Sequence, residues 1–457
     1  IPMSLIRSLI RSLAEKAPSV PGAVRALSYV PFALRKGSDF GRFQDEAKAF
    51  KILSGAAKKQ WIFEKTLSLV KHAENKVEFY RQFYVAAGFS SDELKGYEDL
   101  SLIPIITKAD LKEYSLEGRS ALAIQALNSN TGGTTGQPLS FRIEKSLRDK
   151  EWAYIYYMWQ RRGWRAGFLK LRFGGTNLGN RPFQYVPTEG EFLVNTYMGQ
   201  DEICQVLVTL LKRFPIHYLH GYPSALGAFA RHASEHYQDD LVIPIRKHLR
   251  GILLGSEFPT PCYRDIIEET FGHKTISWYG HSEKAVLAGE KDEPYVYHPF
   301  QSYGWVEAIE NSGSTSRRLI GTNFHGYACP FIRYDTGDTV NLVQENDGLL
   351  ESFRIAEGRI GDMVKDAEGN EISLTALIFG RHHSVFADVQ HIQVAQLTPG
   401  KVLLLASGLP DVPERRQRFW AGFDTSGVDI DFEVKFLDEP VRTPVGKVAL
   451  KVPYPKG

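Results

Sequence analysis

Apolar side chains recur at helical spacing in the part of the chain before residue 125. Residues 58–87 carry such a pattern with Lys and Glu between the apolar positions, and Gly88 supplies a stop, so one long helix is predicted there. Further on, Thr107 is a plausible N-cap, and Asp110 places negative charge in the first turn of the helix that follows. This part of the chain is therefore expected to be helical.

From about residue 125 to 340, short apolar runs rich in β-forming residues alternate with helical stretches. The strand-like runs include 169–173, 251–255 and 275–279, and the helical stretches include 201–213 and 224–236. A strand, a glycine turn and a helix in repeated succession predict an α/β fold with at least partly parallel sheets. In such folds, ligand sites gather where strands end in turns.

The pattern changes again after Asp338. A glycine turn at 358–362 precedes a helical stretch at 374–380 and three short strands at 389–397, 401–407 and 431–437, which together predict a small α+β domain. A chain of 457 residues also exceeds one ordinary hydrophobic core. We therefore expect three regions, namely a basic helical extension (1–50), a large domain (51–358) and a small mobile lid (359–457).

The first 36 residues differ in charge from the rest. They contain six Lys or Arg residues against one Glu, and residues 5–13 place Leu and Ile on one side of a predicted helix and Ser and Arg on the other. Such a helix either packs on its own domain or contacts an anionic membrane surface or a partner, and the sequence leaves both alternatives open. Arg7 and Arg11 interrupt the apolar segment, so a secretory signal is not expected.

Composition excludes several classes of protein. The 55 Lys and Arg residues nearly balance the 53 Asp and Glu residues, and the net charge of +2 gives no general electrostatic case for nucleic acid. Cys204, Cys262 and Cys329 are far apart, so neither a disulfide framework nor a cysteine zinc cluster is expected. No apolar run approaches the ~20 residues that span a bilayer. We expect a cytoplasmic protein, peripheral at the inner face of the membrane if the basic helix binds lipid.

The strongest local signal is the loop at 129–138, SNTGGTTGQP. Its glycines let the backbone approach a ligand closely, and its exposed N–H groups and hydroxyls can surround anionic oxygens. It is not a Walker loop, because no Gly-Lys-Ser/Thr follows. The residues predicted to contact the anion are Thr131, Gly132, Gly133, Thr134, Thr135 and Gly136.

Four further segments follow in order. They are YGHSE at 279–283, which ends a predicted strand, RYDTGD at 333–338, GRIGD at 358–362 and RTPVGK at 442–447. Each segment alone could be an ordinary turn. Five such segments, in this order and at these separations, are much harder to dismiss.

With these segments, the sequence resembles the adenylate-forming ligase superfamily, and more closely the branch of phenylacetate–coenzyme A ligase and the CapK-type capsular polysaccharide biosynthesis proteins. The branch resemblance rests on residues 102–110, 219–224, 254–257 and 279–283, and residues 371–380 are similar to the capsule-type members. The resemblance covers roughly residues 50–457. It implies a large adenylation domain with mixed or parallel sheets flanked by helices, and a small mobile α+β domain.

The resemblance further implies that a small carboxylic acid attacks the α-phosphorus of ATP. The loop from Thr131 to Gly136 would hold the phosphates, with Thr134 among the catalytic groups. Tyr279 would stack on adenine, and Asp338 would accept both ribose hydroxyls. Glu283 would be catalytic by binding Mg²⁺, which neutralises the leaving pyrophosphate.

Two catalytic groups are implied for the small domain and its junction. Arg359 would contact ribose or phosphate, and Lys447 would place its charge beside the α-phosphate and the attacking carboxylate. Further nucleotide contacts are implied for the turns around these positions, namely Gly255, Ser256, Glu257, Trp278, Gly280, His281 and Ser282. The wall of the acyl pocket is implied for His220, Gly221, Tyr222, Pro223 and His281.

The sequence departs from the superfamily in the acceptor region. Residues 365–371 lack the usual glycine-containing loop that lines the pantetheine tunnel, which leaves coenzyme A open as the second substrate. The acceptor is therefore coenzyme A or an amine or hydroxyl, as in a sugar of surface-polysaccharide assembly. The alternative is a degenerate adenylation fold that binds nucleotide or scaffolds a membrane-associated complex. The resemblance is also compatible with a homodimer.

Overall fold

The protein is represented by a computed structural model of the whole chain. It describes residues 30, 36, 38–131, 139–165, 167–311, 315–356, 363–374, 377–378, 381, 383–387, 389, 391–408, 412, 414–441 and 450–454. The predicted basic helix, the loop residues Gly132–Gly136, the turn at 358–362 and Lys447 lie outside these residues. None of the helices in the described ranges is both long and apolar enough to cross a membrane.

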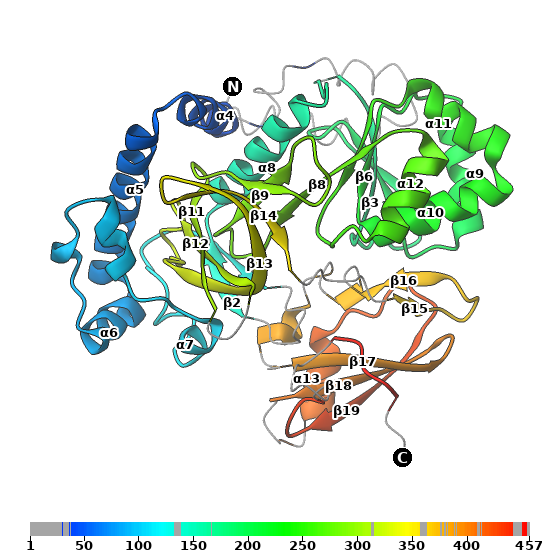
Figure 1. Cartoon of the computed structure of the whole chain (residues 1–457). Helices are drawn as coiled ribbons and strands as arrows, with labels where there is room; N and C mark the ends of the chain where they lie inside the picture. Colours follow the sequence, from blue (N-terminus) through cyan, green and yellow to red (C-terminus); the bar gives the residue numbers. More distant parts are fainter. Residues whose placement is uncertain are drawn as a thin grey trace, which may run out of the picture.

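In the described residues, a sheet of twelve strands runs through the larger part of the molecule (Figure 1). Its order is β11 (Gly304–Glu310), β12 (Arg317–Asn323), β13 (Tyr334–Asn346), β14 (Leu349–Ile355), β10 (Tyr297–Pro299), β9 (Leu287–Glu290), β8 (Thr275–Gly280), β7 (Gly251–Leu254), β6 (Tyr218–Gly221), β3 (Lys170–Gly174), β5 (Glu191–Asn195) and β4 (Phe183–Val186). The strands β8, β7, β6, β3 and β5 are parallel, and β4 closes that edge antiparallel. On the other side of β8, every pair from β9 to β11 is antiparallel. The strand β8 is therefore the seam between a parallel half and an antiparallel half.

Helices cover both faces of the parallel half (Figure 1). One face packs against α4 (Ser38–Lys51) and α8 (Lys145–Gln160), and the other against α9 (Gln200–Leu211), α10 (Pro223–His236), α11 (Ile243–His248) and α12 (Pro261–Phe271). This arrangement requires apolar side chains on both faces of the strands. The predicted α/β fold with parallel strands is confirmed, and the helices expected at 201–213 and 224–236 are α9 and α10.

The helices before the sheet pack against the antiparallel half. They are α5 (Gly55–Lys76), α6 (Glu78–Ala87) and α7 (Lys108–Lys112), next to the hairpin of β1 (Leu127–Asn130) and β2 (Ser140–Ile143). Short 3₁₀ helices span Ser91–Glu93, Tyr97–Leu102 and Ser384–Ala387, and a π-helical turn spans Gln238–Val242.

The single helix predicted at 58–87 is wrong, because Val77 divides it into α5 and α6. Val77 is extended, with φ −123° and ψ 120°, and its side chain is fully buried. The N–H of Phe79, in the first turn of α6, bonds to the carbonyl of Gly118 at 2.9 Å. Packing thus outweighs the local helical pattern. The predicted stop is correct, since Gly88 adopts the left-handed conformation at φ 67°. The predicted N-cap is also correct, since Thr107 Oγ1 accepts the N–H of Asp110.

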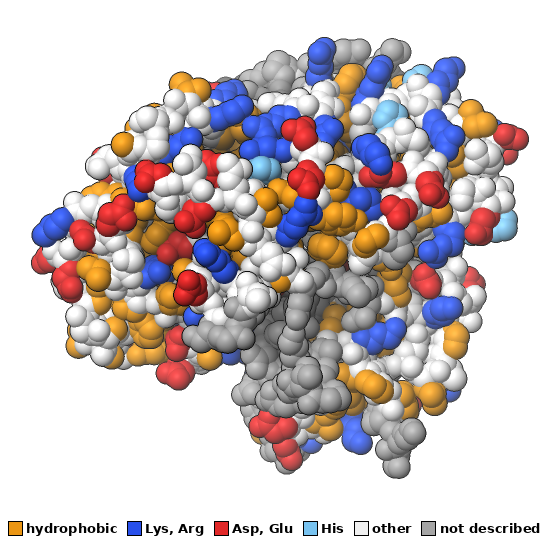
Figure 2. All heavy atoms as spheres, viewed as in Figure 1, with side chains coloured by type: hydrophobic (Ala, Val, Ile, Leu, Met, Phe, Trp, Pro, Cys, Tyr) orange, Lys and Arg blue, Asp and Glu red, His pale blue; other side chains and the backbone are white. Residues whose placement is uncertain are grey.

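The described residues from 363 onward form a second body of structure, here called the C-terminal part. It contains a hairpin of β15 (Met363–Lys365) and β16 (Glu371–Ser373), a sheet of β17 (His391–Thr398), β18 (Lys401–Ser407) and β19 (Asp431–Leu437), and the helix α13 (Arg415–Gly422). The three strands lie within two residues of the predicted ones. This part has a core cluster of its own around Val394, Leu404 and Phe419. On the face shown in Figure 2, cationic and anionic side chains are interspersed.

Candidate functional site

The candidate site lies where β8 ends, at the seam of the sheet. Trp278, Tyr279 and Gly280 are the last residues of β8, and His281, Ser282 and Glu283 form the turn that follows. The neighbouring strands β7 and β6 end at the same edge because all three are parallel. Their turns carry Gly255–Glu257 and Tyr222–Pro223. The structure therefore brings three of the predicted segments to one edge of the sheet.

Glu283 is a buried and ionised carboxylate. Its Oε1 accepts the hydroxyl of Tyr334 at 3.0 Å, and its Oε2 lies 3.0 Å from Nδ1 of His281. Burial would raise the pKa of Glu283, but His281 and the charge of Lys108 outweigh burial and hold the pKa well below the ordinary value. The other ring nitrogen of His281, Nε2, is buried and has no hydrogen-bond partner among the described residues.

The anionic Glu283 suits a magnesium ion, because Mg²⁺ prefers oxygen ligands and takes few of them from protein. Each carboxylate oxygen has two lone pairs, so the bonds to Tyr334 and His281 leave acceptor capacity. In the described residues, no group of three or more His, Cys, Asp or Glu side chains could hold a metal ion alone. A magnesium site at Glu283 would therefore draw its other ligands from phosphate and water.

Tyr279 and Asp338 meet across the seam. The Tyr279 hydroxyl donates to Oδ2 of Asp338 at 2.6 Å. Asp338 lies in an irregular part of β13 and follows Gly337, whose φ of +75° favours glycine. The Thr336 hydroxyl accepts the N–H of Asp338 at 3.2 Å and fixes this backbone conformation. The other carboxylate of this segment, Asp335, bonds to Arg318 Nε at 2.9 Å. The two carboxylates therefore differ, since Asp335 pairs with an arginine inside the sheet and Asp338 lies beside the tyrosine of β8.

The turn after β7 is shaped by close packing. A Cβ at Gly255 would lie 2.1 Å from the indole of Trp278, so only glycine fits beneath that ring. Ser256 has φ 70°, a strained conformation for a residue with a side chain. Glu257 is buried, and its Oε2 accepts the N–H of Ser224 in the first turn of α10 at 3.1 Å. One carboxylate oxygen of Glu257, a predicted nucleotide or metal contact, therefore stabilises the N-terminus of α10.

Thr131 pairs with Leu139 at the base of the predicted phosphate loop. Its N–H donates to the carbonyl of Leu139 at 2.9 Å, and its hydroxyl accepts the N–H of Leu139 at 2.8 Å. The hydroxyl of Thr131 therefore helps to pair the two ends of the loop, and its proton stays available to donate. The predicted contacts Gly132, Gly133, Thr134, Thr135 and Gly136 lie outside the described residues, as do Arg359 and Lys447.

The predicted acyl region lies beside the nucleotide segments, at the end of β6. His220 is buried, with its ring 4.9 Å from that of Trp159, 5.6 Å from Trp278 and 5.9 Å from Trp152. Burial, with the nearby cations Arg172 and Lys170, lowers the pKa of His220 to about 4 although Glu191 opposes the shift, so the ring is neutral at pH 7. The aromatic residues Tyr154, Tyr156 and Trp159 of α8 are core residues on this face of the sheet.

The backbone after His220 is held tightly. A Cβ at Gly221 would lie 2.1 Å from the carbonyl oxygen of Phe173, which admits only glycine. The next N–H, of Tyr222, donates to that oxygen at 2.9 Å. Pro223 then occupies the first turn of α10, where its missing N–H costs nothing. The ring of Tyr222 is half-buried at the same edge of the sheet.

Sequence reasoning missed a group of charged residues on the strands beside His220. Arg172 Nη1 lies 3.2 Å from Glu191 Oε1, and Lys170 Nζ lies 3.3 Å from Glu191 Oε2. The signal was present in the sequence, because Lys170 and Arg172 alternate with apolar residues in a strand that should be apolar on both faces. Such a pattern indicates one polar face on an interior strand.

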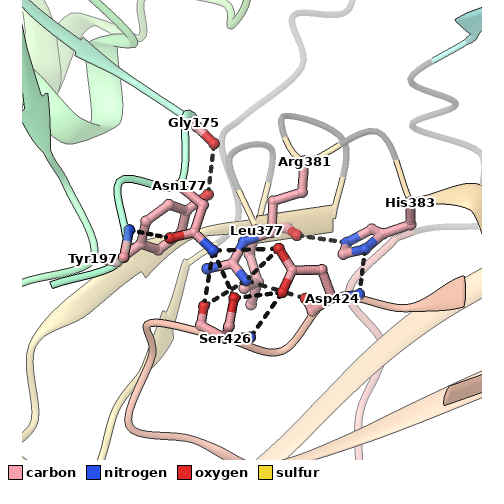
Figure 3. A network of polar contacts seen from close by, with 9 residues as sticks. Gly175, Asn177, Tyr197, Leu377, Arg381, His383, Asp424 and Ser426 are labelled. Atoms are coloured by element: carbon pink, nitrogen blue, oxygen red, sulfur yellow. Dashed lines mark hydrogen bonds and ion pairs between the residues drawn. The ribbon is translucent and has the colours of Figure 1, made fainter. Parts of the chain in front are cut away.

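A second polar group joins the sheet to the C-terminal part, and we call it the bridging network (Figure 3). Asn177, which follows β3, donates to Asp424 Oδ2 at 3.2 Å and to the hydroxyl of Ser426 at 2.8 Å. The guanidinium of Arg381 lies over the ring of Tyr197, 4.2 Å from its centroid, and donates to the carbonyl of Ser426 at 2.8 Å. These contacts hold the turn at 424–427 against the edge where β3 and β5 end.

Comparison with known proteins agrees with this arrangement. No protein-family model matches the chain. Protein CapK of Staphylococcus aureus is 23% identical over 274 residues, which cover 59% of this chain and 59% of CapK. The phenylacetate-coenzyme A ligase of Aromatoleum evansii is 26% identical over 318 residues, which cover 65% of this chain and 69% of that protein. The phenylacetate-coenzyme A ligase of Thermus thermophilus is 25% identical over 296 residues, which cover 62% of this chain and 65% of that protein. The chain thus spans less than two thirds of the length of CapK.

Solved structures show the same fold. A 2-hydroxyisobutyryl-CoA ligase in complex with 2-HIB-AMP and CoA in the thioesterification state aligns with a TM-score of 0.55 at 19% identity, over 88% of this chain and 91% of that one. The same ligase in a postadenylation state aligns with a TM-score of 0.53 at 18% identity, over 88% and 90% of the two chains.

The chain therefore shares its fold, a mixed sheet with helices on both faces of the parallel half, with the 2-hydroxyisobutyryl-CoA ligase. In sequence it is similar to CapK and to phenylacetate-coenzyme A ligases.

Proposed function

We propose that the protein is an ATP-dependent ligase that activates a small carboxylic acid as an acyl-adenylate and releases pyrophosphate. The observation that carries the proposal is the edge of the sheet at β8. There, an ionised Glu283 lies in the turn that follows Tyr279, and Tyr279 bonds to Asp338. The names of the phenylacetate-coenzyme A ligases support the same chemistry.

The chemistry must overcome repulsion, because the attacking carboxylate and the triphosphate are both negative. In the proposal, Tyr279 and Asp338 bind the adenosine, with Asp338 turning from the tyrosine hydroxyl to the ribose hydroxyls. Glu283 holds its negative charge down to acid pH and so can bind a cation. Bound Mg²⁺ would neutralise charge on the leaving pyrophosphate.

The remaining groups of the proposal come from the sequence motifs. The loop from Thr131 to Gly136 holds phosphates, Arg359 contacts ribose or phosphate, and Lys447 brings a positive charge to the α-phosphate. After adenylation, the small domain turns near Gly361 and withdraws Lys447. The bridging network would have to open for such a rotation, because it joins Asn177 and Tyr197 to the C-terminal part.

The acceptor of the acyl group is either the thiol of coenzyme A or an amine or hydroxyl. Coenzyme A is supported by the names of the phenylacetate ligases, and a surface-polysaccharide acceptor is supported by the relation to CapK. Turnover of a preformed acyl-adenylate with coenzyme A, amines and sugars decides between them.

The test is pyrophosphate release across a panel of carboxylic acids with ATP and Mg²⁺. We expect release with at least one acid, and we expect Lys447→Ala to abolish it while nucleotide binding stays nearly unchanged. The matched control is Lys451→Ala, a lysine of the same part that bonds to the carbonyl of Met363. Release that is undiminished in Lys447→Ala would refute the role of Lys447. Tight nucleotide binding with no release from any acid would refute the ligase.

A further inference from the structure

A cleft lies where the C-terminal part meets the parallel half of the sheet. The hairpin of β15 and β16 rests against α10 there (Figure 1). The cleft has a volume of about 460 Å³, and its walls are the start of α9, one side of α10 and the hairpin turn at 368–371. A volume of this size is typical of small-molecule sites, which often lie between domains.

The lining of the cleft is strongly acidic. The described residues that line it include one arginine, Arg231, and five carboxylates, namely Asp201, Glu202, Glu235, Glu368 and Glu371. The whole chain, by contrast, has nearly equal numbers of cationic and anionic residues. Arg231 offsets little of the negative charge, because its guanidinium lies 4.0 Å from Glu371 and both side chains are exposed to solvent. The cleft therefore attracts cations and repels anionic ligands.

The hairpin wall of the cleft has a fixed shape. Asp366 is buried, and its Oδ1 accepts the N–H of Glu368 at 3.0 Å and the N–H of Asn370 at 2.8 Å. Its Oδ2 accepts the side-chain amide of Asn370 at 2.9 Å, and Gly369 completes the turn at φ +88°. A Cβ at Gly199, before α9, would lie 3.5 Å from the amide of Asn370, so the two walls meet there. A wall that is already ordered loses little freedom when a ligand binds.

Gln200 marks a position for a hydrogen-bond donor. Its side-chain oxygen Oε1 is buried and accepts no hydrogen bond from the described residues. Gln200 lines the cleft and also a small crevice beside it, which is lined by Thr196 after β5 and Ala225 in the first turn of α10. A buried acceptor without a donor is unfavourable, so an N–H group of a ligand in the cleft would satisfy it.

The spacing of the charges favours an elongated amine over a metal ion. In the described residues, no group of three or more His, Cys, Asp or Glu side chains could hold a metal ion. The carboxylates are instead spread over α9, α10 and the hairpin, which suits a chain with separated ammonium groups, each with several N–H donors. The N-terminus of α9 does not favour an anion, since Asp201 and Glu202 in its first turn neutralise its positive end.

We propose that this cleft binds a linear aliphatic amine with two or more positive charges, that is, a diamine or a polyamine. The carboxylates of α9, α10 and the hairpin pair with its ammonium groups, and Oε1 of Gln200 accepts one of their N–H groups. The inference goes beyond the proposed function and does not depend on it, because binding is measured without turnover. The crevice at Gln200 reaches the first turn of α10, beside the predicted acyl region, so the amine is either the acyl acceptor or a ligand that does not react.

Calorimetric titration of the full chain with putrescine and spermidine tests the inference, with n-butylamine and Mg²⁺ as comparisons. We expect spermidine to bind more tightly than putrescine, and putrescine more tightly than n-butylamine or Mg²⁺, with affinities that fall as NaCl rises. Glu202→Gln and Glu235→Gln should each raise Kd for spermidine by about twofold to fivefold, as for the loss of an exposed charge pair. Gln200→Leu should raise it by about tenfold with no change in net charge, since it removes a hydrogen bond from a charged donor.

The control is the Glu64→Gln/Glu433→Gln double variant. It makes the same change in net charge as Glu202→Gln/Glu235→Gln, at two exposed glutamates that do not line the cleft, and should leave Kd for spermidine nearly unchanged. Equal weakening in the two double variants, or an unchanged Kd in Gln200→Leu, would mean diffuse attraction and overturn the site. Absence of binding, or binding of putrescine no tighter than that of Mg²⁺, would overturn it too. If Gln200→Leu does not fold by circular dichroism, the two double variants decide.

Acyl transfer distinguishes the two roles of the bound amine. Mass spectrometry of a reaction with ATP, a carboxylic acid and spermidine detects an acyl amide if the amine is the acceptor. In that reaction a neutral nitrogen forms a bond to the acyl carbon, AMP leaves, and the nitrogen loses one proton to water. Spermidine that binds without forming this product is a ligand that does not react. Spermidine binding with no pyrophosphate release from any acid supports the cleft and refutes the ligase, whereas release without spermidine binding does the reverse.

Discussion

The two sides of β8 are built in different ways. On the antiparallel side, Tyr279 lies near the end of β8, Glu283 lies in the turn that follows, and Asp338 lies near the start of β13. Their side chains bond to one another or to close neighbours. On the parallel side, Arg172 and His220 project from within strands, against aromatic rings of α8. The first side offers hydrogen-bonding groups of fixed geometry, and the second offers aromatic rings beside the charged group of Lys170, Arg172 and Glu191.

Under the proposed function, this difference corresponds to what each side would have to recognise. A nucleotide is the same molecule in every adenylating enzyme, and short turn motifs can position the groups that bind it. An acid varies from enzyme to enzyme, and the residues that select it are free to lie on any strand that reaches the pocket. We therefore expect substitutions on the two sides to separate in their kinetic effects, with ATP parameters on one side and acid parameters on the other.

The largest expected effect comes from Glu283→Gln. The change removes a buried negative charge but keeps the shape, so kcat for pyrophosphate release should fall by about 1,000-fold, as for the loss of a group that stabilises charge in the transition state. Selectivity between different acids should not change. The measurement is single-turnover pyrophosphate release at saturating ATP and at varied Mg²⁺. A variant that needs no more Mg²⁺ than wild type would contradict the role of Glu283.

A smaller effect is expected from Tyr279→Phe. The phenylalanine keeps the ring for stacking but loses the 2.6 Å bond to Asp338, so Asp338 is freed and less well positioned. KM for ATP should change by about threefold to tenfold, as for the loss of one intramolecular hydrogen bond, with KM for the acid unchanged. Tyr297→Phe is the control, since Tyr297 bonds to Ser277 on the same strand and away from Asp338. If Tyr279→Phe changed only KM for the acid, the proposed separation of ATP and acid effects between the two sides of β8 would be wrong.

The smallest effect concerns pH. His220 has a pKa of about 4 in the folded protein against an ordinary value of 6.5, so its folded pKa is lowered. The unfolded chain binds a proton more readily below pH 6.5, and stability is lost as the pH falls from about 6.5 towards 4. His220→Gln should remove part of this loss of stability. Each kcal/mol of stability retained at low pH should raise the unfolding midpoint by about 2–4 °C.

His217→Gln is the control for that experiment. Burial also lowers the pKa of His217 to about 4, but this residue precedes β6 at the opposite edge, stacked on Phe168. Both variants should flatten the dependence of the unfolding midpoint on pH between 7 and 5. Only His220→Gln should raise KM for the acid. An equal effect of both variants on the acid would place the acyl pocket elsewhere.

The sequence predicted the strands, the helix cap and the helix stop, and it singled out the motifs at 279–283 and 333–338, because these depend on local order. Tyr279, Glu283 and Asp338 lie in short motifs, and Thr107 and Gly88 act within a few residues of their own position. The division at Val77 and the charged group around Arg172 escaped prediction because they depend on residues far along the chain. Glu191 becomes a partner of Lys170 only when β3 and β5 pair.

The seam at β8 also has a consequence for the order of folding. The parallel half is assembled from consecutive strand–helix units, whereas β10 must pair with β14 after the chain between them has folded into β11, β12 and β13. Pairing across such a separation is slow, because loop-closure entropy is lost before contacts form. Tyr279 and Asp338 meet only when both halves have paired at β8. In a refolding experiment, ATP affinity would therefore develop at the rate of the slower half, and its time course would report when the two halves join.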